Sequence, residues 1–131
     1  MARNRESVVY LDTHVSVWLY AGLVDKITDE AKNAIDKSDL FVSQMVRLEL
    51  QYLFEIGRVK VKADTIIKSL SKTIHLKISD VAFNQIIEEA LKITWTRDVF
   101  DRLLVAEAKT LGHGFISADK NIQANFKQTI W

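Results

Sequence analysis

The chain has 131 residues, of which 48% are hydrophobic and 27% are charged, and its formal net charge is +1. This composition suits one folded domain and excludes a disordered or polycationic chain. Cysteine is absent, which excludes disulfide frameworks and thiolate metal sites. No run approaches the roughly 20 apolar residues of a membrane span, and the first residues do not resemble a signal peptide. We therefore expect one soluble, cytoplasmic domain over residues 1–131.

The N-terminal half alternates short apolar runs with longer helical patterns. A continuous apolar run predicts a strand buried on both faces, and a serine or threonine ahead of a helical pattern predicts a helix N-cap. In chain order, the predicted elements are a strand at 8–11, a helix at 14–21 ending near Gly22, a helix capped by Thr28, a strand at 40–42, and a helix from Ser43 to Ile56 closed by Gly57.

The C-terminal half continues the alternation. It predicts a helix at 63–70, a strand at 74–78, a helix capped by Ser79 that runs to about 91, a helix at 98–111, a strand at 115–116, a short helix after Asp119 and an edge strand at 129–131. Strands that alternate with helices indicate an α/β fold, here a three-layer sandwich with a central, mostly parallel sheet of about five short strands.

Two aspartates directly follow predicted strands. Asp12 comes after the strand at 8–11, and Asp119 lies just beyond the strand at 115–116. Ligands of open α/β sheets gather at the carboxyl ends of the strands, so both residues are candidate site residues. Each of them alone is equally well explained as a helix N-cap.

Two further acids interrupt apolar faces of predicted helices. Glu49 lies within a stripe formed by Met45, Tyr52, Leu53 and Ile56. Asp101, with Asp98 three residues earlier, lies within a face formed by Phe100, Leu104, Val105, Ala108 and Leu111. An unpaired carboxylate in such a place costs several kcal/mol. The alternatives are buried salt bridges to Arg47, Arg97 or Arg102, or an acidic pocket that both residues share with the strand-end aspartates.

A shared acidic pocket has a clear chemical consequence. Carboxylates that are brought together stay ionised only where a positive charge neutralises them. Hard oxygen ligands without thiolates or paired histidines favour Mg²⁺ or Mn²⁺. An ion held in this way activates water and stabilises the charge that develops on a phosphodiester.

Four motifs carry a family resemblance. They are Leu-Asp-Thr-His at 11–14, Leu-Glu-Leu at 48–50, Arg-Asp-Val-Phe-Asp-Arg-Leu-Leu-Val-Ala-Glu-Ala at 97–108, and Ser-Ala-Asp at 117–119. In this order and spacing, the sequence resembles PIN-domain nucleases of the VapC toxin type over nearly the whole chain. It departs from the common family pattern at Val99, where a proline is frequent, and at Ser117, where threonine is more usual.

The resemblance implies roles for particular residues. Asp12, Glu49, Asp101 and Asp119 would be the catalytic acids that bind Mg²⁺ or Mn²⁺. Auxiliary roles would fall to Asp98 as a further ligand, and to Thr13 and Ser117 as hydroxyls that shape the site. The resemblance also implies endonucleolytic cleavage of RNA, a cognate antitoxin that blocks the site, and a homodimer.

A basic segment is the candidate RNA-binding surface. Between residues 58 and 77 there are six basic residues and one acid, Asp64. Lys68 and Lys72 share a helical face, and together with Arg102 they are the candidate contacts to RNA phosphates. The alternative, which the sequence supports equally well, is that these basic residues form a solvent-exposed helix face that binds no RNA.

Two other functions are compatible with this pattern. A PIN-like module could bind RNA or a partner protein without cleaving anything, although retention of all four acids speaks against this. A phosphoacceptor signalling domain is also a small α/β sandwich. Such domains pair two acids after the first strand, and Asp12 has no adjacent acid.

Overall fold

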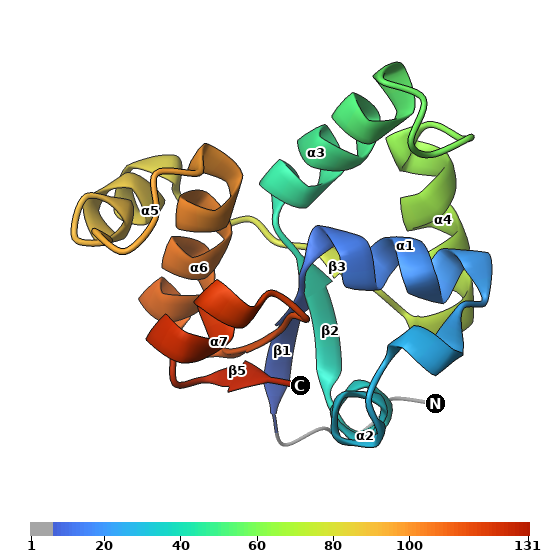
Figure 1. Cartoon of the computed structure of the whole chain (residues 1–131), viewed down its shortest axis with the longest axis horizontal. Coiled ribbons are helices and arrows are strands. Elements are labelled where there is room, and N and C mark those ends of the chain that lie inside the picture. Colours follow the sequence, from blue (N-terminus) through green and yellow to red (C-terminus); the bar gives the residue numbers. More distant parts are fainter. Residues whose placement is uncertain (1–6) are drawn as a thin grey trace.

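A computed structural model of the chain describes residues 7–131 (Figure 1). The strands of this part are β1 (Val8–Leu11), β2 (Asp39–Val42), β3 (Lys77–Ile78), β4 (Gly114–Ile116) and β5 (Thr129–Ile130). The helices are α1 (Thr13–Ala21), the short 3₁₀ helix η1 (Val24–Lys26), α2 (Asp29–Lys37), α3 (Gln44–Glu55), α4 (Ala63–Ile74), α5 (Phe83–Ala90), α6 (Val99–Leu111) and α7 (Lys120–Asn125).

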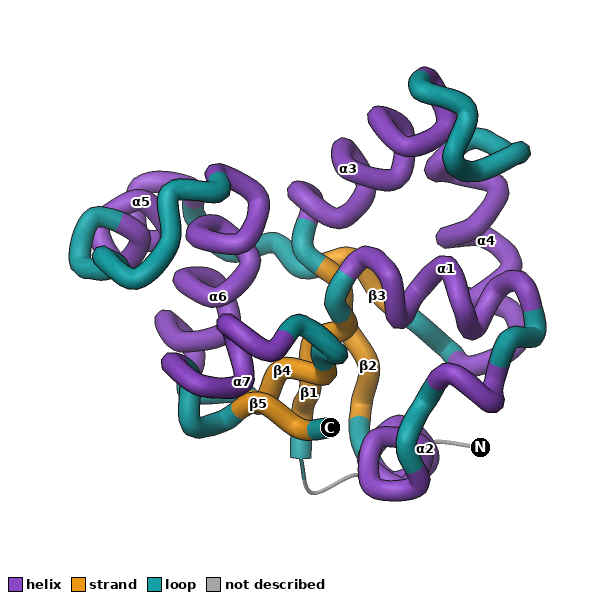
Figure 2. Tube along the Cα trace, viewed as in Figure 1, coloured by secondary structure: helices purple, strands orange, loops and turns teal. Residues whose placement is uncertain are grey.

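The strands form one parallel sheet in the order β3-β2-β1-β4-β5. Helices α1 to α4 lie on one side of this sheet and α5 to α7 lie on the other, which gives three layers (Figures 1 and 2). The predicted α/β three-layer sandwich with a parallel sheet is confirmed. Strand order reverses between β1 and β4, and in such sheets the crevice for ligands opens at this switch point.

The core is built from the apolar strand residues and the inward stripes of the helices. Leu11, Val42 and Ile116 are fully buried in the three central strands, and Val15 and Leu50 bury the faces of α1 and α3 against them. Central strands that are covered on both faces explain why the run at 8–11 is continuously apolar. None of the helices in residues 7–131 is long and apolar enough to cross a bilayer.

Two element boundaries differ from the sequence prediction. The predicted strand at 74–78 shrinks to β3, because α4 continues to Ile74 and ends at His75, whose φ of 57° is left-handed. Ile74 extends the buried stripe that Ile66 and Leu70 begin, at the spacing of four residues that a helix requires.

Ser79 is not the N-cap of α5, contrary to the prediction. Its backbone N–H donates to the Val42 carbonyl at 2.8 Å, and its hydroxyl is hydrogen-bonded to Tyr10 at 2.6 Å. Because both groups are engaged at the end of the sheet, the chain stays extended. Helix α5 therefore begins only after Ala82, without a side-chain cap.

Candidate active site

The carboxyl ends of β1 and β4 bring Asp12, Ser117 and Asp119 together. The Ser117 hydroxyl donates to Asp12 Oδ2 at 2.6 Å and accepts the backbone N–H of Asp119 at 3.1 Å. Asp12 Oδ1 accepts the Thr13 N–H at the start of α1, and Asp119 Oδ1 accepts the Ile122 N–H in α7. Both aspartates are thus helix N-caps, and both also lie at the switch point of the sheet.

Asp12 is the most deeply placed of these acids, with 8% of its surface exposed. Burial raises the pKa of its carboxyl group, while the hydrogen bonds from Ser117 and Thr13 and the nearby His14 lower it. The charge of Asp119 raises the pKa of Asp12 further, so the two strand-end acids act on one another.

Glu49 on α3 reaches the same region. The Thr13 hydroxyl donates to Glu49 Oε1 at 2.5 Å, which links α1 to α3 across 36 residues of sequence. Burial raises the pKa of Glu49, and the charges of Asp12 and Asp98 raise it as well. The predicted apolar stripe around Glu49 is only partly correct. Tyr52 and Ile56 are about half exposed, so Glu49 lies at the edge of the buried face.

Asp101 on α6 is the acid that is most strongly affected by the others. Its pKa rises to about 7, first because of burial and then because of the charges of Asp98, Asp12, Asp119 and Glu49. Asp98 is the N-cap of α6 and accepts the Asp101 N–H at 3.0 Å. Four of the five acids that the sequence singled out therefore act on the fifth, Asp101, although the five come from four separate segments of the chain.

Two of the three arginines proposed as buried partners bind other groups, and the third, Arg97, is exposed. Arg47 forms a two-bond ion pair with Asp64, at 2.7 and 2.9 Å. The Arg102 guanidinium donates to the Ala90 carbonyl at 3.1 Å, at the end of α5. Among the ion pairs of residues 7–131, none involves Glu49 or Asp101. The salt-bridge alternative is therefore wrong for these two acids.

The donor set fits a hard divalent cation. It consists of carboxylates, and in three of them, Asp12, Glu49 and Asp101, burial and the charges of the other acids raise the pKa. A bound cation would offset both effects. Within the part of the chain that the structure describes, no three acidic or histidine side chains are close enough to form a preassembled metal-binding group. The acids thus face one region without converging on a point.

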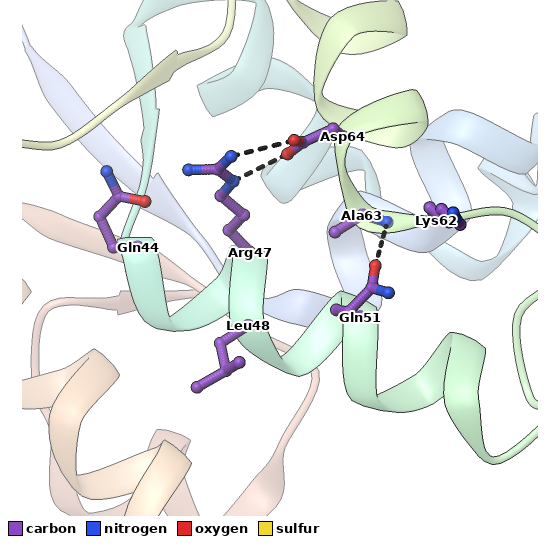
Figure 3. A pocket seen from close by; sticks show the side chains of 7 residues that line it. All are labelled: Gln44, Arg47, Leu48, Gln51, Lys62, Ala63 and Asp64. Carbon is purple, nitrogen blue, oxygen red and sulfur yellow. Dashed lines mark hydrogen bonds and ion pairs between the residues drawn. The ribbon is translucent and has the colours of Figure 1, made fainter.

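A pocket of about 440 Å³ lies between α3 and the start of α4, and its lining residues include none of the five acids (Figure 3). Arg47 points across it to Asp64, and the Gln51 side chain accepts the Ala63 N–H at 3.2 Å. Leu48, the neighbour of Glu49, lines the pocket together with Lys62. The charge of Lys68 lowers the pKa of Asp64, which places Lys68 near this pocket. Lys72 is exposed further along α4.

Two residues of this region were not predicted as site residues from the sequence. The exposed His14 lies close enough to lower the pKa of both Asp12 and Glu49. Its position directly after Asp12 and Thr13 was the available signal. Glu107 is buried on α6, and the helical pattern offered a signal for it: it interrupts the apolar face of this helix, three residues after Leu104 and four before Leu111.

Comparisons with known proteins identify the family and the fold. The PIN domain family model matches residues 9–127. The fold is similar to a chain of VapBC2 from Rickettsia felis bound to a DNA fragment from the promoter, with a TM-score of 0.64 and 15% identity over 89% of this chain and 92% of that chain. It is also similar to a chain of a toxin–antitoxin complex from Klebsiella pneumoniae, with a TM-score of 0.62 and 16% identity over 94% of this chain and 96% of that one. A search of curated proteins finds no match. The chain belongs to the PIN-domain family.

Proposed function

We propose that this chain is a Mg²⁺- or Mn²⁺-dependent endoribonuclease that acts as the toxin of a toxin–antitoxin pair. The observation that carries the proposal is the pKa of Asp101, which Asp98, Asp12, Asp119 and Glu49 jointly raise. The five acids come from four separate segments, and N-capping accounts for three of them but not for Glu49 or Asp101. Strongly perturbed pKa values cluster at functional sites. Membership of the PIN-domain family and a fold shared with chains of toxin–antitoxin complexes give further support.

Asp12, Glu49, Asp101 and Asp119 would hold the cation, with Asp98 as an auxiliary ligand. A bound Mg²⁺ supplies an activated water and compensates the charge of the phosphodiester oxygens. The chain's own part is to orient these ligands. Ser117 and the Thr13 N–H hold the two oxygens of Asp12, and the Thr13 hydroxyl holds one oxygen of Glu49, so that both carboxylates have a defined orientation.

The substrate in this proposal is RNA, bound along α3 and α4. Lys68 and Lys72 are exposed on α4, and Arg47 and Lys62 line the pocket next to the segment that carries Glu49. Cationic side chains in this position would hold phosphates on the approach to the acids. Arg102 would contribute only if its guanidinium left the Ala90 carbonyl.

Incubation of the purified protein with RNA tests the proposed activity. We expect internal cleavage with Mg²⁺ or Mn²⁺, no cleavage with EDTA, and no cleavage by Asp12→Asn or Asp101→Asn proteins that remain folded. Exposed Asp80→Asn is the matched control and should cleave normally. Normal cleavage by the two site variants would refute the assignment. RNA binding without cleavage under both metals would instead support the non-catalytic PIN-like regulator.

A cognate antitoxin is the proposed partner, in the cytoplasm where the RNA lies. The two similar folds occur in toxin–antitoxin assemblies, and an inhibitor that covers the acids would silence the enzyme. Expression of the chain alone should arrest growth, and coexpression of the small protein encoded next to it should restore growth. Arrest by the Asp101→Asn variant would contradict this reading.

The proposed oligomer is a homodimer. Two helices with their C-caps carry large exposed apolar side chains at intervals of four residues. They are Leu48 and Tyr52 on α3 with its C-cap Ile56, and Phe83 and Ile87 on α5 with its C-cap Leu91. Apolar stripes of this kind are usual at subunit interfaces. Light scattering after size-exclusion chromatography should give twice the chain mass of 15.0 kDa. The Leu91→Asp variant should give the monomer mass, and a monomeric wild type would refute the proposal.

A further inference from the structure

Glu107 is a buried acid outside the proposed catalytic set. It lies on α6 with 3% of its surface exposed, and its carboxylate oxygen Oε2 has no hydrogen-bond partner within residues 7–131. Buried acidic side chains of this kind are rare unless they are paired, and each requires an explanation. The other buried residues of α6 are all apolar, so packing alone does not account for a carboxyl group at this position.

Three hydroxyl groups from separate elements surround this carboxyl group. Ser43, Ser79 and Tyr10 each form hydrogen bonds that lower the pKa of Glu107, against the larger effect of burial, which raises it. Ser43 lies between β2 and α3, Ser79 follows β3, and Tyr10 is in β1. Tyr10 and Ser79 are themselves hydrogen-bonded at 2.6 Å. Glu107 thus connects α6 with the ends of three neighbouring strands.

The contact with Ser43 has a specific geometric effect. Ser43 is the N-cap of α3, where its oxygen accepts the Met45 N–H at 3.0 Å, so its hydroxyl proton is free to be donated to Glu107. Glu49 lies six residues after Ser43 on α3, and Asp101 lies six residues before Glu107 on α6. Six residues correspond to about 9 Å of helix. The hydrogen bond between Ser43 and Glu107 therefore links α3 to α6 at a point about 9 Å along each helix from Glu49 and Asp101.

We propose that Glu107 is a positioning residue that sets the spacing between Glu49 on α3 and Asp101 on α6 through the N-cap hydroxyl of Ser43. This inference rests on the proposed metal-binding role of the acids. Glu107 does not touch the cation or the RNA. It acts through the helix start that it holds, as groups beyond the direct ligands commonly do at metal sites.

Mn²⁺ binding to the folded protein tests the proposal without reference to RNA cleavage. Isothermal titration should show that Glu107→Ala binds Mn²⁺ about 10-fold or more weakly than the wild type, which is the usual loss for an outer-shell group. Glu107→Gln, whose amide oxygen still accepts the Ser43 hydroxyl, should bind within about 2-fold of the wild type. Exposed Glu88→Ala on α5 is the control and should bind normally. Circular dichroism verifies that each variant is folded.

A second pair of variants applies if Glu107→Ala does not fold. Ser43→Ala removes the hydroxyl that links Glu107 to α3, and Thr28→Ala removes the equivalent N-cap from α2, which carries none of the acids. Only Ser43→Ala should weaken Mn²⁺ binding, although both lose a cap. Equal Mn²⁺ affinities in the two cap variants, or in folded Glu107→Ala and wild type, would overturn the proposal and leave the proposed nuclease intact. A wild type that binds no Mn²⁺ would overturn both.

Discussion

Replacing Asp101 by asparagine should make the protein more stable and at the same time abolish its activity. The pKa of Asp101 is about 7, whereas the ordinary value is 3.8. A difference of this size corresponds to roughly 4 kcal/mol of unfavourable free energy for the ionised form in the folded state. Because Asp101 is only partly buried, solvent screens part of this cost, and we expect a gain of about 2 kcal/mol for Asp101→Asn in metal-free protein at pH 8.

The sign of the pH dependence follows from proton linkage. Between about pH 4 and pH 7, the folded state keeps the Asp101 proton that the unfolded state has lost, so the stability contributed by the protonated carboxyl group declines as the pH rises through this window. The asparagine variant lacks this decline. The difference in free energy of unfolding between the variant and the wild type should be near zero below pH 4, should grow between pH 4 and pH 7, and should reach its full value above pH 7.

Urea unfolding at several pH values, in EDTA and then with Mn²⁺, measures this effect. The cation should reverse the order of stabilities, because it binds the folded wild type and a concentration of 100 times the dissociation constant adds about 2.7 kcal/mol. Asp80→Asn, an exposed substitution, should follow the wild type throughout. An Asp101→Asn protein that is no more stable than the wild type at pH 8 would refute the claim that the acids repel one another.

Three further changes test other parts of the structure. Ser117→Ala removes the donor to buried Asp12 and should cost about 1–3 kcal/mol in urea unfolding, so an unchanged midpoint would contradict the hydrogen bond. Lys68→Glu combined with Lys72→Glu should weaken RNA binding and reduce the slope of log K against log salt by about 1.4, and an unchanged slope would place the RNA elsewhere. Leu50→Ala, at a fully buried position of α3, should cost about 2–5 kcal/mol, and a loss below 1 kcal/mol would argue against this core.

The sequence was sufficient to predict strands and helix N-caps where the local sequence pattern agrees with the packing of the fold. The strand at 8–11 and the N-caps Thr28 and Ser43 were predicted as they occur, because continuous apolar runs and capping hydroxyls act within a few residues of sequence. The prediction was wrong at Ser79. Serine often caps helices, but here the residue forms its hydrogen bonds with groups that are distant in the sequence. Its hydroxyl bonds to Tyr10, 69 residues away, and no local pattern contains that information.

Some features of the candidate site could likewise be predicted from the sequence, and others could not. Helical periodicity indicated that Glu49 and Asp101 had unusual places, but it could not show that Arg47 pairs with Asp64 rather than with Glu49. Nor could it show that Ser117, which follows β4, would hold Asp12, which follows β1. The pairing of an acid with its neighbour depends on strand order, and strand order is decided by the packing of the whole sheet.

The N-cap and metal-ligand interpretations of the aspartates do not exclude one another. Asp12, Asp98 and Asp119 begin α1, α6 and α7, so three helix N-termini lie around the same group of acids. The partial positive charge of a helix N-terminus stabilises a carboxylate there by about 0.3–1 kcal/mol. The caps at Asp98 and Asp119 use one carboxylate oxygen each and leave the other oxygen able to bind a cation. Both oxygens of Asp12 already accept a hydrogen bond, and each keeps a second lone pair for a cation. The caps thereby offset part of the repulsion among the acids, and we expect the fold to persist after EDTA treatment, with Mn²⁺ adding stability to a structure that is already formed.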